Sequence, residues 1–262
     1  GSDRERANAG AGSRDSDSRG RRIRACMAAV YMLGMGMTSA ALKDLSPAVP
    51  GQFDAVAVPP APPVPDKASP PEVCRRWAEE TLVHAVAERT HPYHLVTIAS
   101  TDADGSPEAR MVVCRGVDPV ARTVRFHTDV RSPKVTALRA RPRVTALFYH
   151  PGPRIQLRLK ATATVHHQDE EAGRHWLATR DFSKRCYLTP HAPSSVLHPE
   201  QVPAGYPPYV PEEDPAGYAR FCAVVCRYDT LELLRLSAQG HERWRWRWEA
   251  GEDDPQVEAL AP

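Results

Sequence analysis

The run VTALFYHPGPRIQLRLKATATVHH (residues 144–167) decides the fold class, because its apolar side chains recur at every second position. In its second part, residues 154–167, they alternate with Gln, Arg, Lys and Thr. This period of two is typical of a strand with one buried and one polar face. A short turn separates the two parts, so we expect two neighbouring antiparallel strands.

The same period continues along the chain in both directions. We expect strands at residues 93–100, 108–116, 122–128, 219–229 and 231–237, and in QGHERWRWRW (239–248). Helical patterns interrupt them at 132–142 and 169–180, and a proline-rich loop spans 190–215. Many antiparallel strands with few helices favour a closed or nearly closed β-barrel, because closure removes exposed edges. The expected class is therefore mainly β, a β-barrel with flanking helices.

An amphipathic helix is expected directly before the strands. PEVCRRWAEETLVHAVAER (71–89) has a proline in a first-turn position. Apolar side chains follow at near-helical spacing, namely Val73, Trp77, Leu82, Val83 and Val86.

Residues 1–70 are expected to be a low-complexity extension ahead of a folded domain at 71–262. Residues 1–22 contain almost nothing to bury, which predicts disorder, and residues 47–71 form a proline-rich linker. Between them, IRACMAAVYMLGMGMTSAAL (23–42) is apolar and follows arginines. It is compatible with a signal peptide, a short membrane segment, or an upstream extension ahead of a later start methionine.

The bulk composition narrows the function class. The chain has 34 Lys and Arg residues against 32 Asp and Glu, which argues against a dedicated nucleic-acid binder. Six cysteines include no CxxC pair, and Cys222 and Cys226 would lie about 13 Å apart along a strand. That distance is too long for a disulfide or a shared metal ion. We therefore expect reduced, buried thiols in a cytoplasmic protein with no metal site and no membrane contact.

The stretch SPEARMVVCRG (106–116) places an arginine inside an apolar strand. Alternation puts Arg110, Val112 and Cys114 on one face and Met111, Val113 and Arg115 on the other. A buried arginine needs an anion beside it. The residues alone leave open whether that anion is a ligand or an internal carboxylate.

The stretch HTDVRSPKVTALRARP (127–142) resembles a phosphate site at the start of a helix. Ser132 suits the N-cap, Pro133 suits the first turn, and Lys134 lies where free backbone N–H groups point outward. A helix N-terminus with a lysine favours an anion. An ordinary capped helix with a solvated lysine would show the same residues.

Taken in order, these motifs resemble the pyridoxamine 5'-phosphate oxidase family. The order is R-x-V-x-x-[K/R]-G, a strand ending F-x-T, S-x-K opening a helix, R-x-x-x-x-F-Y and a Gln-containing strand, and the chain ends with H-x-R-[F/W] and Leu-Ala-Pro. The matching residues are 110–116, Phe126, His127, Thr128, Ser132, Lys134, Phe148, Tyr149, Gln156, His241, Arg243, Trp244 and 260–262. The resemblance covers roughly residues 71–262.

The resemblance implies an FMN-binding split β-barrel, Greek-key-like, assembled as a homodimer with one FMN at each of two subunit interfaces. Arg110 and Lys134 would hold the FMN phosphate, and Gln156 would face the flavin ring. Ser194 and Arg243 would complete each site from the second subunit. The implied cofactor-binding set is Arg110, Met111, Val112, Val113, Cys114, Arg115, His127, Thr128, Ser132, Lys134, Gln156, Ser194 and Arg243.

The implied reaction is oxidation of pyridoxamine or pyridoxine 5'-phosphate to pyridoxal 5'-phosphate, with dioxygen as electron acceptor. His241 and Arg243 are the implied catalytic residues. The implied substrate-binding set is Arg115, Trp176, Arg180, Lys184, Gln239 and His241. Within that set, Arg180 and Lys184 suit the substrate phosphate.

Some positions depart from the family pattern. Arg115 and Pro133 stand where the family has Lys and Arg. Trp176 and Lys184 replace Tyr and Ser, and a flavin-side tryptophan is replaced near Leu234.

The departure with the clearest chemical consequence is Gln239, which replaces an arginine. Loss of that arginine removes a charged fork for a substrate anion. The flavin positions therefore match better than the substrate positions. A flavin-binding relative with another substrate, and a non-catalytic module, stay open alternatives.

Two further stretches have alternative interpretations. VHHQDEE (165–171) is compatible with a metal site, or with carboxylates at the start of a helix. In QGHERWRWRW, alternation predicts an arginine face and a tryptophan face, the latter packing into the barrel or against a second subunit. The arginine face begins with His241 and Arg243.

Overall fold

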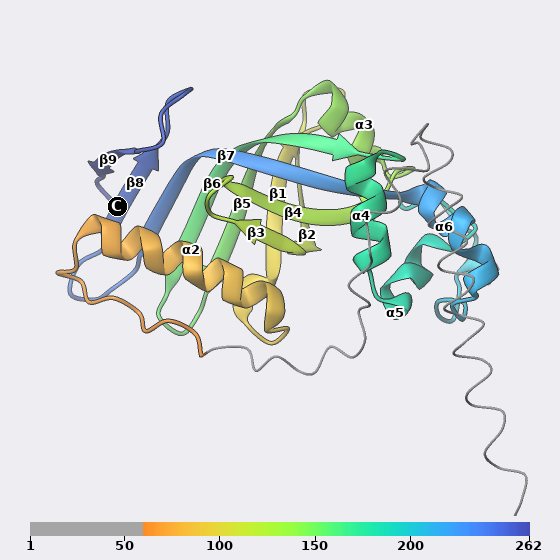
Figure 1. Cartoon of the computed structure of the whole chain (residues 1–262), viewed down its shortest axis with the longest axis horizontal. Coiled ribbons are helices and arrows are strands. Elements are labelled where there is room, and N and C mark those ends of the chain that lie inside the picture. Colours follow the sequence, from red (N-terminus) through yellow and green to blue (C-terminus); the bar gives the residue numbers. More distant parts are fainter. Residues whose placement is uncertain (1–59) are drawn as a thin grey trace, which may run out of the picture. The chain divides into compact units, whose positions relative to one another are not determined.

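The computed structural model describes residues 60–262, so the expectations for residues 1–59 lie outside the described part. In this part the chain builds one antiparallel sheet of nine strands (Figure 1). They are β1 (Leu95–Thr101), β2 (Pro107–Val113), β3 (Gly116–Asp118), β4 (Thr123–Asp129), β5 (Arg143–His150), β6 (Ile155–His166), β7 (Phe221–Arg235), β8 (Glu242–Arg247) and β9 (Gln256–Ala259).

The sheet curls into a half-barrel, which confirms the expected mainly β class. Its strand order is β2-β1-β5-β6-β7-β4-β3, and β8 and β9 extend it beside β7. The long strands β6 and β7 pair from Ile155↔Arg235 to His166↔Ala223, with a register shift between Lys160 and Ala161. Such an irregularity bends a long strand and increases its twist.

Helices flank the sheet at two places (Figure 1). Helix α2 (Pro71–Ala87) crosses one face, while α4 (Glu170–Ala178), α5 (Asp181–Lys184) and α6 (Asp214–Arg220) gather at one end. Helix α3 (Pro133–Ala140) connects β4 to β5. Short 3-10 turns are η1 (Pro92–His94), η2 (Arg185–Tyr187), η3 (Pro199–Gln201) and η4 (Pro211–Glu213). None of the helices within residues 60–262 is both long and apolar enough to cross a bilayer.

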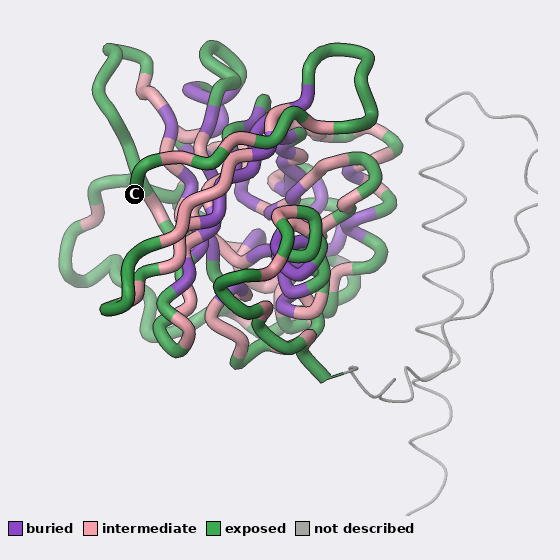
Figure 2. The backbone as a smooth tube through the Cα atoms, turned by 90° about the vertical axis from the view of Figure 1, so that its left-hand side faces the viewer, coloured by how far each residue is buried: buried purple, intermediate pink, exposed green. Residues whose placement is uncertain are grey.

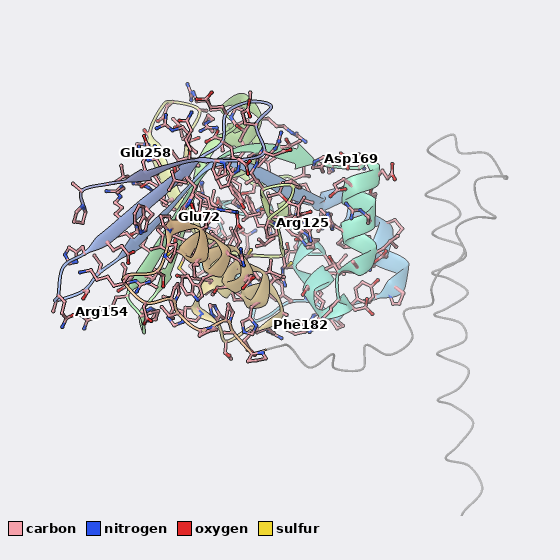
Figure 3. The ribbon with its side chains drawn as sticks, turned by 60° about the vertical axis from the view of Figure 1, so that its left-hand side comes forward. Glu72, Arg125, Arg154, Asp169, Phe182 and Glu258 are labelled. Carbon is pink, nitrogen blue, oxygen red and sulfur yellow. The ribbon has the colours of Figure 1, made fainter. Side chains whose placement is uncertain are left out.

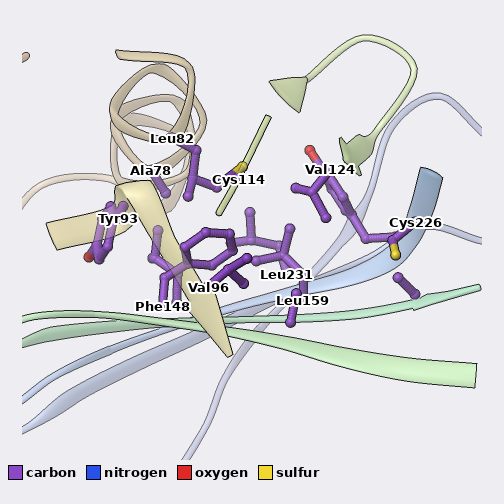
Figure 4. Close-up of a cluster of buried hydrophobic side chains, with 14 of the residues drawn as sticks. Ala78, Leu82, Tyr93, Val96, Cys114, Val124, Phe148, Leu159, Cys226 and Leu231 are labelled. Atoms are coloured by element: carbon purple, nitrogen blue, oxygen red, sulfur yellow. The ribbon is translucent and has the colours of Figure 1, made fainter. Parts of the chain in front are cut away.

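Helix α2 forms as expected, but its buried face differs from the predicted one. The apolar side chains that it buries are Cys74, Trp77, Ala78, Leu82 and Ala85. Ala78 and Leu82 point toward Val96 and Phe148 of the sheet (Figure 4). Val73 and Val83 are 45% and 44% exposed, so their assignment to the apolar face was wrong. The small buried residues Cys74, Ala78 and Ala85 let the helix approach the sheet closely. A search for large apolar residues at helical spacing does not find them.

Four strand predictions need correction. The two strands expected at 219–229 and 231–237 are one continuous β7, because β4 and β8 continue its pairing along one edge. Residues 219–220 belong instead to α6, which begins inside the expected proline-rich loop. Strand β2 ends at Val113, and β8 begins only at Glu242. The short strands β3 and β9 were not expected.

The arginine–tryptophan strand has the two faces that alternation predicts. Trp246 is fully buried and Trp248 is 7% exposed, so this side packs into the barrel core. Arg245 and Arg247 instead contact Glu258 of β9. Figure 2 shows buried segments in the interior of the molecule and exposed loops around them. The stretch is therefore a structural strand of the barrel.

Candidate functional site

A cation lies at the junction of β4 and α3, where the sequence predicts a phosphate site. Ser132 is the N-cap residue of α3 and Pro133 follows in the first turn. Lys134 Nζ donates to Ser132 Oγ at 2.7 Å and to Thr128 Oγ1 at 3.1 Å. Burial, followed by the nearby Arg110 charge, lowers the pKa of Lys134. The ammonium group is therefore held by two hydroxyl groups in a position where an anion would stabilise it.

Arg110 is the second cation of this junction. Its Nη1 donates to Ser100 Oγ at 2.6 Å and more weakly to Ile98 O at 3.4 Å. The carboxylate within ion-pair distance belongs to Glu108, at 3.7 Å, and is 52% exposed. Such a solvated pair contributes little. The buried carboxylate of Asp129 is bonded by Arg131 instead.

The donor set at this junction fits a phosphate. Two cations, two hydroxyl groups and a helix N-terminus converge, and a phosphate dianion needs cations and N–H donors together. The FMN phosphate therefore fits the residues that are present.

A pocket of about 710 Å³ opens between α2, the β2–β4 strands and α4–α5. Its lining comprises Val86, Ala87, Arg89, His94, Leu95, Val113, Cys114, Arg115, Arg125, His127, His175, Ala178, Thr179, Arg180, Phe182 and Ser183. This volume suits a small molecule. Four arginines and no carboxylate line it, so it favours an anion.

Five of the predicted site residues line this pocket, namely Val113, Cys114, Arg115, His127 and Arg180. The sequence interpretation missed Arg89, His94, Arg125 and His175. One signal was available, because alternation in RTVRFHT puts Arg125 on the same strand face as His127. No local pattern connects either residue with His175 on α4.

Two histidines of the pocket, His127 and His175, have pKa values lowered by burial and by the nearby Arg125 charge. Burial, then the nearby Arg125 charge, lowers the pKa of His127 to about 3. Its ring lies 5.7 Å from that of His175, whose Nε2 is 2.7 Å from Glu171 Oε1. His127 Nε2 is buried and has no hydrogen-bond partner among the described residues.

Two predicted substrate residues are used inside the protein instead. Trp176 is 1% exposed, and its Nε1 donates to Asp214 Oδ2 at 2.9 Å. Lys184 is 6% exposed, with Nζ at 3.2 Å from Asp214 Oδ1. Tyr209 donates to the same carboxylate at 2.5 Å. These contacts tie α4, α5 and α6 together, so this geometry gives no support to a substrate role for Trp176 or Lys184.

A third group of predicted residues lies at the opposite end of β7. Gln156 pairs with Leu234, and Leu234 pairs with Arg243 across the sheet. His241 lies in the turn before β8, where Ser237 N donates to its Nδ1 at 3.1 Å. Gln239 in the same turn is exposed, and its carbonyl accepts from Lys67 Nζ at 2.8 Å.

Three more of the predicted cofactor-binding residues, Ser194, Met111 and Val112, lie outside the phosphate junction, the pocket and the end of β7. Ser194 is exposed on the long loop between η2 and η3, with a positive φ of 70°. Met111 is 65% exposed on β2, and Val112 beside it is half-buried. One chain therefore does not gather all the predicted site residues in one place.

The VHHQDEE stretch forms a helix start. Asp169 is the N-cap of α4 and accepts from Ala172 N at 2.8 Å. Its other oxygen lies 3.0 Å from His166 Nδ1. Within the described part of the chain, no group of three or more His, Cys, Asp or Glu residues is arranged to hold a metal ion. The carboxylates here serve as the helix cap.

Comparison with known proteins agrees with this geometry. Residues 75–167 match the family model described as "Pyridoxamine 5'-phosphate oxidase, FMN-binding domain". The pyridoxine/pyridoxamine 5'-phosphate oxidase of Caulobacter vibrioides is 32% identical over 123 residues, which are 45% of this chain and 52% of that protein. That of Bordetella petrii is 37% identical over 82 residues, 31% and 36% of the two chains. The chain thus spans about half the length, or less, of these curated relatives.

Solved structures share the fold. A pyridoxamine 5'-phosphate oxidase-related, FMN-binding protein of Nostoc punctiforme superposes with a TM-score of 0.57 at 21% identity, covering 71% of this chain and 97% of that one. PhzG from Burkholderia lata, in complex with tetrahydrophenazine-1-carboxylic acid, gives 0.54 at 18% identity, covering 82% and 100%. Residues 75–167 thus match the FMN-binding domain model of the pyridoxamine 5'-phosphate oxidase family, and the described chain has the split-barrel fold of these solved structures.

Proposed function

We propose that this protein is an FMN-dependent oxidase that converts pyridoxamine or pyridoxine 5'-phosphate to pyridoxal 5'-phosphate, with dioxygen as electron acceptor. The observation that carries the proposal is the junction where Lys134, Thr128 and Ser132 meet beside Arg110. It offers two cations, and neither has a buried carboxylate partner among the described residues. The described chain also has a pocket large enough for a substrate.

FMN, when bound, supplies the electron acceptor for the substrate. Lys134 and Arg110 would hold its phosphate, because charge-assisted hydrogen bonds to phosphate are among the strong ones. Arg115 and Arg180 line the pocket and are both exposed at its opening, where they would bind the substrate phosphate. Apolar and aromatic lining residues such as Phe182 would exclude water from the ligand.

We also propose that the protein is a homodimer whose flavin sites are shared between subunits. Thr128 pairs with Cys222 near the start of β7, whereas Gln156 pairs with Leu234 near its end. Those two β7 positions are about 40 Å apart in an extended strand. One FMN cannot contact both ends of β7 in one chain. A second copy would bring Gln156 and Arg243 to the phosphate junction of the first.

A reducing compartment is part of the proposal. Five cysteines of the described chain are free thiols, and four of them are buried. Proteins that keep cysteines in this form usually function in the cytoplasm.

A different substrate is the second candidate, and a specific observation favours it. Trp176 and Lys184 are bonded to Asp214, so of these two predicted substrate residues and Arg180, Arg180 alone lines the pocket. A flavoprotein of this fold acting on another anion would show the same arrangement.

Two measurements test these proposals in sequence. The visible spectrum of the purified protein, with cofactor extraction and mass identification, tests for FMN. A colourless protein that cannot be reconstituted with FMN would contradict both enzyme proposals and favour a non-catalytic module. Turnover of pyridoxamine 5'-phosphate, followed as peroxide and pyridoxal 5'-phosphate, separates the first candidate from the second. A yellow protein without this turnover would favour another substrate.

A further inference from the structure

Arg125 has an unusually constrained position in the pocket. Its Nη2 donates to Arg115 O at 2.9 Å, and the backbone N of Arg115 donates to Arg125 O at 2.7 Å. The guanidinium group lies directly over Gly116, where an added Cβ would be 2.5 Å from Nη2 and 2.7 Å from Cζ. The absence of a side chain at Gly116 therefore makes the room that the guanidinium occupies.

This guanidinium group has no carboxylate partner. No Asp or Glu of the described residues lies within ion-pair distance of Arg125. Glu171 acts on its charge from further away but bonds Arg174 and His175 instead. Arg125 Nε is buried and has no hydrogen-bond partner in the described structure. Burial accordingly lowers the pKa of Arg125.

His127 presents a second unsatisfied nitrogen on the same wall. It lies two residues further along β4, so both side chains point to the same face of the strand. Its buried Nε2 also lacks a partner among the described residues. Buried polar groups are nearly always hydrogen-bonded, so these two nitrogens of one pocket wall are available to a polar ligand.

The position of Arg125 agrees with this interpretation. Figure 3 shows Arg125 between α2 and α4, with Phe182 of α5 below it, and both line the pocket. The arginines Arg115 and Arg180 are exposed, whereas Arg125 is half-buried. A ligand held by the two exposed arginines therefore has a further cation deeper in the pocket.

We propose that Arg125, together with His127, is a specificity-determining site that binds an oxyanion of the substrate, carboxylate or phosphate, on a planar molecule. The proposal rests on the proposed function, because it names the substrate class of the same pocket. A guanidinium group binds oxyanions through parallel N–H groups, which a lysine cannot reproduce. Planar rings suit the pocket because His94, His127 and Phe182 line it.

Calorimetric titration of the purified holoprotein tests the proposal with three probes of one shape. They are 2-naphthoate, 2-naphthyl phosphate and neutral 2-naphthamide. We expect both anions to bind more tightly than the amide, and their order shows which oxyanion the site prefers. Arg125→Gln should weaken anion binding by about 10- to 100-fold and leave amide binding unchanged.

Two further variants separate position from charge. Gly116→Ala should weaken anion binding although it keeps Arg125, because the new Cβ displaces the guanidinium group. Arg227→Gln removes an exposed arginine of β7 outside the pocket and should bind the anions like the parent protein. Arg125→Lys keeps the charge but loses the parallel N–H groups, so it should also weaken anion binding. It replaces Arg125→Gln in the test if that variant does not fold.

The titrations include results that would overturn the inference. Equal affinity for naphthoate and naphthamide in the parent protein, or unchanged anion affinity in folded Arg125→Gln or Gly116→Ala, overturns the inference. An effect of Arg227→Gln as large as that of Arg125→Gln also overturns it, since general charge would then explain binding. The flavin spectrum and pyridoxamine 5'-phosphate turnover are read separately. Their failure rejects the proposed function, whereas the charge selectivity of the probes decides this inference.

Discussion

Arg243 Nη2 donates to Glu232 Oε2 at 2.7 Å, which fixes a predicted flavin residue to a buried carboxylate of the neighbouring strand. Glu232 is 3% exposed and also accepts from Arg158 and Arg245. Arg158, Glu232, Arg245 and Glu258 lie directly opposite one another on four adjacent strands. Opposite charges therefore alternate across the sheet, and cross-strand pairs of this kind stabilise it.

Replacing Glu232 by Gln should lower the free energy of unfolding by about 1–3 kcal/mol, because three arginines lose their shared carboxylate. Equilibrium urea unfolding at pH 7 measures this. Glu258→Gln is the matched control in the same row, and it should cost clearly less because solvent screens its more exposed pairs. Equal costs for the two variants would contradict the central position of Glu232.

The same carboxylate predicts acid sensitivity. Burial alone would raise the pKa of Glu232, but the hydrogen bonds and charges of Arg243, Arg158 and Arg245 outweigh it and hold this pKa at about 2, below the ordinary 4.5. Its contribution to stability is therefore complete above pH 4.5 and is lost as the pH falls toward 2. Glu232→Gln should unfold with a weaker pH dependence in this window.

Lys134→Ala should weaken FMN binding by about 10- to 100-fold, because it removes a charge-assisted contact to phosphate. Fluorescence titration of the apoprotein with FMN measures the effect. Arg139→Ala removes an exposed cation from the same helix and should leave the affinity unchanged. Unaltered FMN affinity in Lys134→Ala would count against the assigned phosphate site.

A cluster of three histidines, His84 of α2 with His91 and His150, predicts a loss of stability in mild acid. The His91 ring lies 5.6 Å from that of His84 and 5.2 Å from that of His150. Burial and these neighbours lower the pKa of His91 to about 4, against the ordinary 6.5. The unfolded chain therefore takes up the proton first, and stability that is complete above pH 6.5 declines as the pH falls toward 4.

Urea unfolding between pH 7 and pH 4 measures this decline, which we expect to include about 1–2 kcal/mol from His91 after discounting for solvent. His91→Asn keeps an acceptor for Tyr93 N, the contact that starts η1, and should flatten the curve. His191→Asn, at an exposed position, should not. Parallel curves for the parent and His91→Asn would rule out this origin.

Trp246→Ala should cost about 3–5 kcal/mol, because the side chain is fully buried in the core. Trp246→Phe should cost clearly less, since it keeps an aromatic ring and removes a buried Nε1 that has no partner among the described residues. Trp244→Ala, at a half-buried position, serves as the comparison. Chemical unfolding of the three variants gives the order, and a larger loss for Trp244→Ala would contradict the register of β8.

Gln239→Arg should lower the KM for pyridoxamine 5'-phosphate by about tenfold, because it restores a cation for a substrate anion. Ala238→Arg adds the same charge to the neighbouring exposed position and should have a smaller effect. Steady-state kinetics compare the two variants. An unchanged KM in Gln239→Arg would show that this turn does not contact the substrate.

The sequence by itself predicts the mainly β class, helix α2, the start of α3 and the two faces of β8. These features depend on the spacing of apolar residues and on helix capping, which neighbouring residues determine. The same local order of motifs was enough to predict the FMN-binding family. Strand ends were less predictable: β7 runs through Asp229 and Thr230 because β6 and β8 pair along it.

Only the tertiary structure decided which of the candidate side chains are available to a ligand. Trp176 and Lys184 are bonded to Asp214, more than 25 positions away in the chain, and no local pattern predicts that contact. Arg125 became a candidate because Gly116 leaves room for it and its Nε has no hydrogen-bond partner among the described residues. Burial and charge pairing are properties of residues brought together from distant parts of the chain. For that reason, the sequence alone predicted the type of site, and the fold determined which residues form it.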